Sequence, residues 1–155
     1  MTLHARYTRD EILVALGHWT RDTQKDMREG VLHLPTIQAD AFLFTLHKTE
    51  KQYSPTTMYQ DYAVNEHLFH WQSQSTTSAD SPTGRPYIEH LSRGYTILLF
   101  GREYKQENNL AAPYFFLGPA RYVSHIGSRP ISMTWRLDYP LPAKLLRRMA
   151  RLAVG

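Results

Sequence analysis

The chain of 155 residues contains no cysteine. This absence excludes disulfide bonds, thiolate zinc sites and cysteine nucleophiles, and it is typical of cytoplasmic proteins. No apolar run approaches the roughly 20 residues that a transmembrane helix needs. The charged residues Arg9, Asp10 and Glu11 stand where a signal peptide would carry its apolar core. We therefore expect a cytoplasmic protein with no membrane segment.

Catalytic motifs are also missing from the sequence. It contains no phosphate-binding glycine loop, no dinucleotide fingerprint and no G-x-S-x-G elbow. Among its eight histidines, His67 and His70 fall three apart on a predicted strand, where side chains three apart point to opposite faces. The polar central stretch holds only Asp61 and Glu66 as acids, fewer than a two-metal nuclease needs. The sequence predicts a protein that is not an enzyme and that uses no metal or cofactor.

The composition is that of one globular domain, because 42% of the residues are hydrophobic and 21% are charged. The net charge of +4 permits nucleic-acid binding without requiring it. Thr8 and Glu11 form a predicted capping box for a helix with an apolar stripe that starts at Ile12. A short helix is expected over 84–92, and a basic amphipathic helix over 142–153.

Between these helices, alternating apolar residues predict about seven short strands. They cover residues 31–34, 41–47, 59–64, 68–74, 95–104, 114–125 and 131–137. Gly118-Pro119 interrupts the sixth strand and predicts a β-bulge or sharp bend. We therefore predict an α+β fold over 1–155: a small, strongly bent, mostly antiparallel β-barrel flanked by two or three helices.

The strand 68–74 is the most informative stretch for function. Amides that both donate and accept hydrogen bonds, placed beside aromatic rings, suit the reading of a nucleobase. A half-buried strand whose glutamines face water is the commoner interpretation of such alternation. Because Trp71 alternates with Gln72 and Gln74, only a bulge or the end of the strand would bring them together. The predicted base-binding pocket consists of Tyr53, Tyr59, Asp61, Trp71, Gln72, Ser73 and Gln74.

Cations near loops and strand ends are the predicted contacts to the DNA backbone. These residues are Lys48, Lys51, Arg121, His125 and Arg129. Basic residues in loops are usually just solvated, so each of them also has an ordinary structural explanation.

Several segments together resemble one family. They are residues 53–57, 59–64, 68–77, 114–130 and 135–137. The family is a domain of unknown function (family 3427) carried at the C-terminal end of bacterial superfamily-two helicase proteins, often with a phospholipase-D-type nuclease domain. This resemblance implies a restriction or phage-defence context and a helicase or nuclease partner, on the same or another chain.

The strand order 115–123 followed by 133–137 is also similar to the late strands of SRA-type and other PUA-like barrels. That similarity implies base flipping and recognition of a modified base. The resulting hypothesis is a DNA-binding module that reads a modified or flipped base in double-stranded DNA. Two alternatives stay open: a non-catalytic module that docks onto a helicase, and a metal-dependent nuclease with dispersed acids. The sequence does not identify the base, the modification or the oligomeric state.

Overall fold

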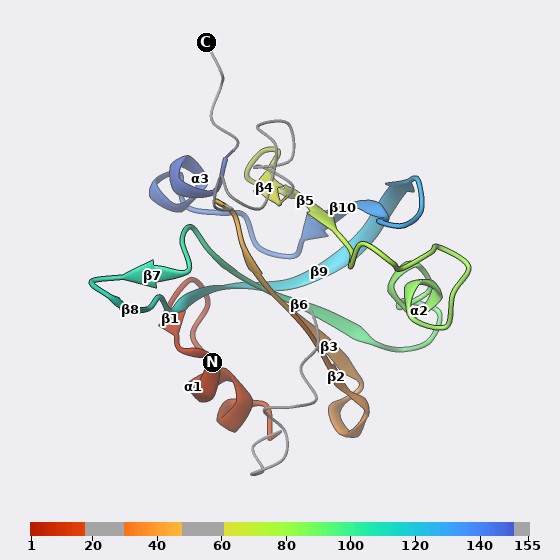
Figure 1. Cartoon of the computed structure of the whole chain (residues 1–155), viewed down its shortest axis with the longest axis horizontal. Helices are drawn as coiled ribbons and strands as arrows, with labels where there is room; N and C mark the ends of the chain where they lie inside the picture. Colours follow the sequence, from red (N-terminus) through yellow and green to blue (C-terminus); the bar gives the residue numbers. More distant parts are fainter. Residues whose placement is uncertain (18–29, 48–60, 151–155) are drawn as a thin grey trace.

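The computed structural model describes residues 1–17, 30–47 and 61–150. Its helical elements are α1 (Arg9–Ala15), the 3₁₀ turn η2 (Pro35–Ile37), α2 (Gly84–Ile88) and α3 (Ala143–Met149). Its strands are β1 (Arg6–Tyr7), β2 (Val31–Leu34), β3 (Ala39–Thr45), β4 (Tyr62–Ala63), β5 (Leu68–Gln72), β6 (Thr96–Arg102), β7 (Gln106–Glu107), β8 (Leu110–Ala111), β9 (Tyr114–Ile126) and β10 (Ser132–Leu137). The predicted α+β class is confirmed (Figure 1).

One mixed, mostly antiparallel sheet of eight strands organises the domain. The strand order is β2-β3-β6-β9-β10-β5-β4, and β1 adds to β9. Among the strands that the structure describes, only β3 and β6 pair in parallel. In the described part of the chain this order is an open path from β2 to β4, while β7 and β8 form a separate small hairpin. That hairpin occupies a segment for which the sequence predicted no strand.

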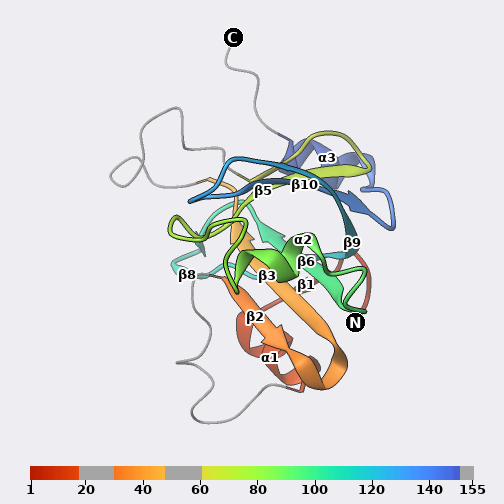
Figure 2. The same ribbon diagram turned by 90° about the vertical axis from the view of Figure 1, so that its right-hand side faces the viewer.

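The sheet bends so far that its second half lies over its first half. Figure 2 shows β5 and β10 above β3 and β6, with the long β9 passing from one layer to the other. Phe42 of β3 stacks on Trp71 of β5 at 4.2 Å between ring centroids, and Phe44 contacts Phe69 at 5.1 Å. The main core therefore lies between two halves of one sheet.

Strand β3 is buried on both faces because a second core lies beneath it. Phe42 and Phe44 face the main core, whereas Ala41 and Leu43 pack toward Ile12 of α1. The capping box predicted for this helix is present: the Glu11 N–H donates to Thr8 Oγ1, and the Thr8 N–H donates to the Glu11 carboxylate. Helix α1 thus covers the face of β3 that points away from the main core, while Phe42 of the same strand points into that core.

The bulge predicted at Gly118-Pro119 is confirmed. Leu99 of β6 pairs with Gly118, but its neighbour Phe100 pairs with Phe116, so Leu117 is the extra residue. Gly118 has φ +93°, a conformation that suits glycine. The bulge lets β9 continue as a single bent strand, where the sequence suggested two segments about a bend.

The prediction of a helix over 142–153 is wrong at its C-terminal end. Helix α3 ends at Met149, because Ala150 is extended and forms an isolated bridge with Ala63. Pairing with β4 replaces the next helical turn there, and residues 151–153 lie outside the described part. No helix among the described residues has the length and apolar character needed to span a membrane.

Candidate functional site

The predicted base-binding residues that the structure describes all line one cavity, here called the amide cavity. It has a volume of about 670 Å³ and lies where β5 ends. Five predicted residues line it: Asp61, Trp71, Gln72, Ser73 and Gln74. The cavity also takes polar groups from other strands and loops, namely Thr45, Ser75, Lys105 and Tyr114. Side chains alternate between two faces along β5, but this alternation stops where the strand ends at Gln72. Trp71, Gln72 and Gln74 can therefore line the same cavity.

A buried carboxylate holds the end of β5 in place. Asp61 is 5% exposed, and its Oδ1 accepts the backbone N–H of Gln72 at 2.9 Å. The Gln72 side-chain amide donates to Ser132 Oγ of the neighbouring β10 at 3.1 Å. Its amide oxygen accepts no hydrogen bond from the described residues. Gln72 is therefore oriented through its nitrogen and keeps an acceptor for a ligand.

Two further hydrogen bonds orient Gln74 beyond the strand end. Its amide nitrogen donates to the Tyr87 hydroxyl at 3.3 Å, and its amide oxygen accepts from Thr77 Oγ1 at 3.0 Å. The adjacent Ser73 hydroxyl accepts the backbone N–H of Ile131 at 2.8 Å and donates to the carbonyl of Gln74 at 3.1 Å. These bonds join the loop after β5 to the turn before β10, so the polar wall of the cavity is held from two sides.

Trp71, one of the predicted pocket residues, does not offer an exposed ring on which a base could stack. Trp71 is only 4% exposed, because Phe42 stacks on it and Tyr87 contacts it edge-on at 5.7 Å. The residue lies in the core, as the burial of alternate residues along β5 dictates. It contributes an apolar wall to the cavity, and a stacking partner for a base has to come from another residue.

The predicted backbone contacts do not form one surface. Arg129 is exposed in the turn next to Pro130, which lines the amide cavity, and its backbone N–H donates to the Thr77 carbonyl. Arg121 pairs across strands with the exposed Arg136 and forms an ion pair with Asp138 at 3.3 Å.

His125 lies on the other face of β9. It stands opposite the fully buried Met133 and shares a 2.7 Å hydrogen bond with the Tyr122 hydroxyl. Since directly paired residues project from the same face of a sheet, Arg121 and His125 point to opposite sides of β9. Of the described predicted cations, Arg129 is the one whose chain neighbour, Pro130, lines the cavity.

Four predicted residues lie outside the described residues: Lys48, Lys51, Tyr53 and Tyr59. Their predicted roles stay predictions. The described residues Thr45 and Asp61, which come before and after this segment in the chain, both line the amide cavity.

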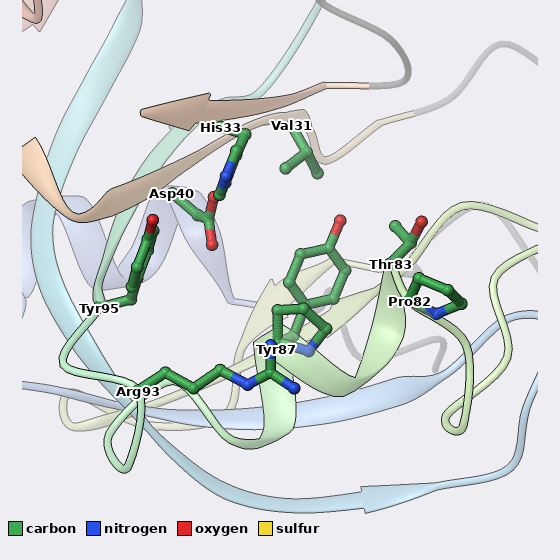
Figure 3. Close-up of a pocket in the computed structure, with 9 residues that line it drawn as sticks. Val31, His33, Asp40, Pro82, Thr83, Tyr87, Arg93 and Tyr95 are labelled. Atoms are coloured by element: carbon green, nitrogen blue, oxygen red, sulfur yellow. The ribbon is translucent and has the colours of Figure 1, made fainter. Parts of the chain in front are cut away.

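A second cavity, which the sequence did not predict, lies between the β2–β3 hairpin and α2 (Figure 3). This hairpin cavity has a volume of about 410 Å³. Its lining includes His33, Asp40, Tyr87, Arg93 and Tyr95. Sequence reasoning missed Asp40 because the predicted strand began at residue 41, whereas β3 begins at Ala39 and includes Asp40 among apolar residues. A carboxylate is out of place in such a strand unless it is partnered. That anomaly was the available signal.

His33 and Asp40 are directly paired across β2 and β3. Asp40 is 2% exposed, and its Oδ1 lies 2.6 Å from His33 Nδ1. An ionised carboxylate can only accept, so Nδ1–H is the donor and a neutral His33 keeps Nε2 as an acceptor. The His33 ring in turn lies parallel to the Tyr95 ring, with centroids 5.6 Å apart. Register and stacking thus fix this polar pair in the wall of the cavity.

His90 supports Tyr95 from behind. Its Nδ1 is 2.9 Å from the Tyr95 carbonyl, and its Nε2 accepts the Tyr122 N–H at 3.0 Å. Because Nε2 is an acceptor and the residue is only 1% exposed, burial lowers the pKa of His90 below its ordinary value. The imidazole is therefore a neutral structural link between β9 and the segment before β6.

Metal ligation has no support among the described residues, where no three His, Asp or Glu side chains converge on one point. In the described part, the chemistry that both cavities offer is hydrogen bonding by amides, hydroxyls and carboxylates beside aromatic rings.

Comparison with known proteins agrees with the resemblance seen in the sequence. No curated protein matches the chain. One family model covers residues 1–149, nearly the whole chain, and its description is domain of unknown function, DUF3427. The chain therefore belongs to the DUF3427 family.

Proposed function

We propose that this domain is a DNA-binding module that recognises a modified or flipped base in double-stranded DNA, and that the amide cavity receives that base. The observation that carries the proposal is the gathering of Asp61, Gln72 and Gln74 around one cavity of about 670 Å³. Side-chain amides and carboxylates are the groups that read base edges, because they match the donors and acceptors that bases carry.

The energetics of base extrusion support a pocket of this kind. Taking a base out of the stack costs a few kcal/mol, which hydrogen bonds and apolar contacts in the pocket must offset. The amide cavity offers both, since the acceptor oxygen of Gln72 lies at the same cavity as the apolar walls formed by Trp71 and Phe44. Lys105 in the lining and Arg129 beside it would meet the phosphates of the flipped nucleotide.

Part of this proposal is that the bent sheet is a PUA-like barrel of the SRA type, acting in a restriction or phage-defence context beside a helicase or nuclease. Its support is the coiling that brings β5 over β3, seen in the contact between Phe42 and Trp71, together with the family membership. The domain would supply target recognition and leave cleavage to its partner.

The test is binding of the purified domain to short duplexes that differ in one central base. That base is unmodified, methylated, hydroxymethylated or glucosylated, and a further duplex carries a phosphorothioate linkage. Each duplex is measured at two salt concentrations. Tighter binding of one modified duplex that persists at the higher salt is expected, because base contacts depend less on salt than phosphate contacts do.

Matched variants assign that selectivity to the cavity. Gln72→Ala should remove the preference for the modified duplex, whereas Gln106→Ala, an exposed glutamine of β7, should leave it unchanged. Equal binding of all duplexes that disappears at the higher salt would reduce the activity to backbone contact. Absence of binding at low salt would instead favour a module that docks onto a helicase.

A further inference from the structure

Asp40 is a buried residue whose second carboxylate oxygen borders the hairpin cavity. Asp40 is 2% exposed, yet among the described residues it makes one hydrogen bond, from its Oδ1 to His33. Figure 3 shows the other carboxylate oxygen directed into the space between Tyr95 and Tyr87. A buried carboxylate is costly unless it is hydrogen-bonded, so this oxygen is suited to a ligand that donates N–H groups.

The walls of the cavity suit a flat ligand. Figure 3 shows the rings of His33 and Tyr95 edge-on at one side, and Tyr87 rising from α2 at the other. Val31 and Pro86 add apolar surface between these rings. Aromatic side chains stack planar heterocycles favourably, and the volume of about 410 Å³ is within the range of small-molecule sites.

Arg93 adds donors on the far side of the cavity from Asp40, where Figure 3 shows its side chain extended. Glu89 holds the guanidinium through Nη2 at 3.0 Å and Nε at 3.3 Å. Nη1 makes no hydrogen bond with the described residues. The ligand therefore needs donors on one edge and acceptors on another.

We propose that the hairpin cavity is a second binding site, distinct from the amide cavity, and that it takes a guanine base. Guanine carries a ring N–H and an exocyclic amino group side by side, which match the two oxygens of the Asp40 carboxylate: the oxygen that borders the cavity and the lone pair of Oδ1 that His33 leaves unused. Its O6 and N7 acceptors match an arginine, the commonest specific partner of guanine. Adenine and cytosine offer an amino group but no adjacent ring N–H on the same edge. The guanine can come from a free nucleotide or from a DNA strand.

Free nucleosides test this site without DNA, so the result does not depend on the role proposed for the amide cavity. Calorimetric titration of the domain with guanosine, inosine, adenosine and cytidine is the first experiment. Guanosine should bind saturably, and inosine, which lacks the amino group, should bind about tenfold more weakly, as expected for one hydrogen bond to a charged group. Equal binding of guanosine and inosine, or no guanosine binding up to about 10 mM, would overturn the proposal.

Variants locate the site. Asp40→Asn should weaken guanosine binding at least tenfold, whereas Asp80→Asn, an exposed aspartate, should not change it. Arg93→Gln alters a surface side chain, so it tests the opposite side of the cavity even if Asp40→Asn fails to fold. Gln72→Ala should leave guanosine binding intact. Guanosine binding that survives both cavity variants would overturn the assignment.

The source of the guanine is decided by a second set of ligands: guanosine monophosphate and short single strands with one guanine or none. Stronger binding of the monophosphate than of any strand assigns the site to a free nucleotide. Selective binding of the strand that contains guanine, lost in Arg93→Gln, assigns it to DNA. Both results support a guanine site, and failure of both ligands to bind would contradict it.

Discussion

The two cavities are connected through contacts between their lining residues, such as Trp71 and Tyr87, but they are built in different ways. Gln74, which lines the amide cavity, donates to the hydroxyl of Tyr87, which lines the hairpin cavity. The amide cavity lies at a strand end, and hydrogen bonds between a loop and a turn hold its polar groups. The hairpin cavity has its polar pair inside two regular strands, where the register sets it.

This difference suggests that the two cavities tolerate substitutions to different degrees. A loop held by several hydrogen bonds can lose one and still keep the others. A buried carboxylate between two strands depends on a single imidazole, so its loss has no substitute among the described residues. We therefore expect changes at the hairpin cavity to affect stability more, and changes at the amide cavity to affect selectivity more.

The largest effect is expected from Phe42→Ala, because Phe42 packs against a lining residue of each cavity. Phe42 is fully buried and contacts Trp71, Tyr87 and Trp135. Truncation of a buried phenylalanine costs about 3–5 kcal/mol, which corresponds to a fall in Tm of roughly 10 °C for a domain of this size. Thermal and urea unfolding would measure it. Leu110→Ala, at a side chain that is 73% exposed, is the control and should change little. A loss under 1 kcal/mol in Phe42→Ala would contradict the assignment of Phe42 to the core that supports both cavities.

The next largest loss of stability is expected from a change that affects the hairpin cavity alone. His33→Ala removes an imidazole that is 62% exposed but leaves the Asp40 carboxylate buried without its hydrogen bond. We expect a loss of about 1–3 kcal/mol in the free energy of unfolding, the usual penalty for an unsatisfied buried group. The double variant with Asp40→Asn should lose less than the sum of the two single variants. Additive losses in urea unfolding would show that the pair is not coupled.

A smaller effect is expected when the pH is lowered. Burial lowers the pKa of His90 in the folded protein, and also those of His4 and His47. Below the ordinary histidine value of about 6.5, the unfolded chain therefore binds more protons than the folded one. The free energy of unfolding should be highest above this pH and should fall as the pH drops below it. In urea titrations at several pH values, His90→Gln should show a shallower fall. An unchanged slope would mean that His90 does not contribute to the pH dependence.

The elements whose pattern is local could be predicted from the sequence. The capping box at Thr8 and Glu11, the bulge at Gly118 and the alternation along β10 depend on neighbouring residues, and all are present. The end of α3 could not be predicted, because Ala150 leaves the helix to pair with Ala63, far away in the chain. Tertiary pairing overrode a good helical pattern there.

The same contrast holds for the candidate sites. Asp61, Gln72 and Gln74 are polar residues in one short segment of the sequence, so they could be grouped without knowledge of the fold. The pair of His33 and Asp40 depends on the register between β2 and β3, which residue types alone do not determine. The burial of Trp71 was missed because the polar neighbours along the chain concealed the fact that its own face of β5 is covered by β3.

The smallest effect on stability, and the sharpest test of where DNA lies, comes from the two predicted backbone arginines. Arg129 has φ +57°, so Arg129→Asn is the suitable change, because asparagine tolerates this conformation. If the amide cavity faces DNA, this variant should weaken binding of all duplexes alike and reduce the slope of log affinity against log salt by about 0.9. Arg121→Gln removes an exposed ion pair with Asp138, which contributes about 0–1 kcal/mol to stability. Because Arg121 belongs to the opposite face from His125, its loss should leave the slope unchanged. The reverse result would move the DNA to the outer face of β9 and away from both cavities.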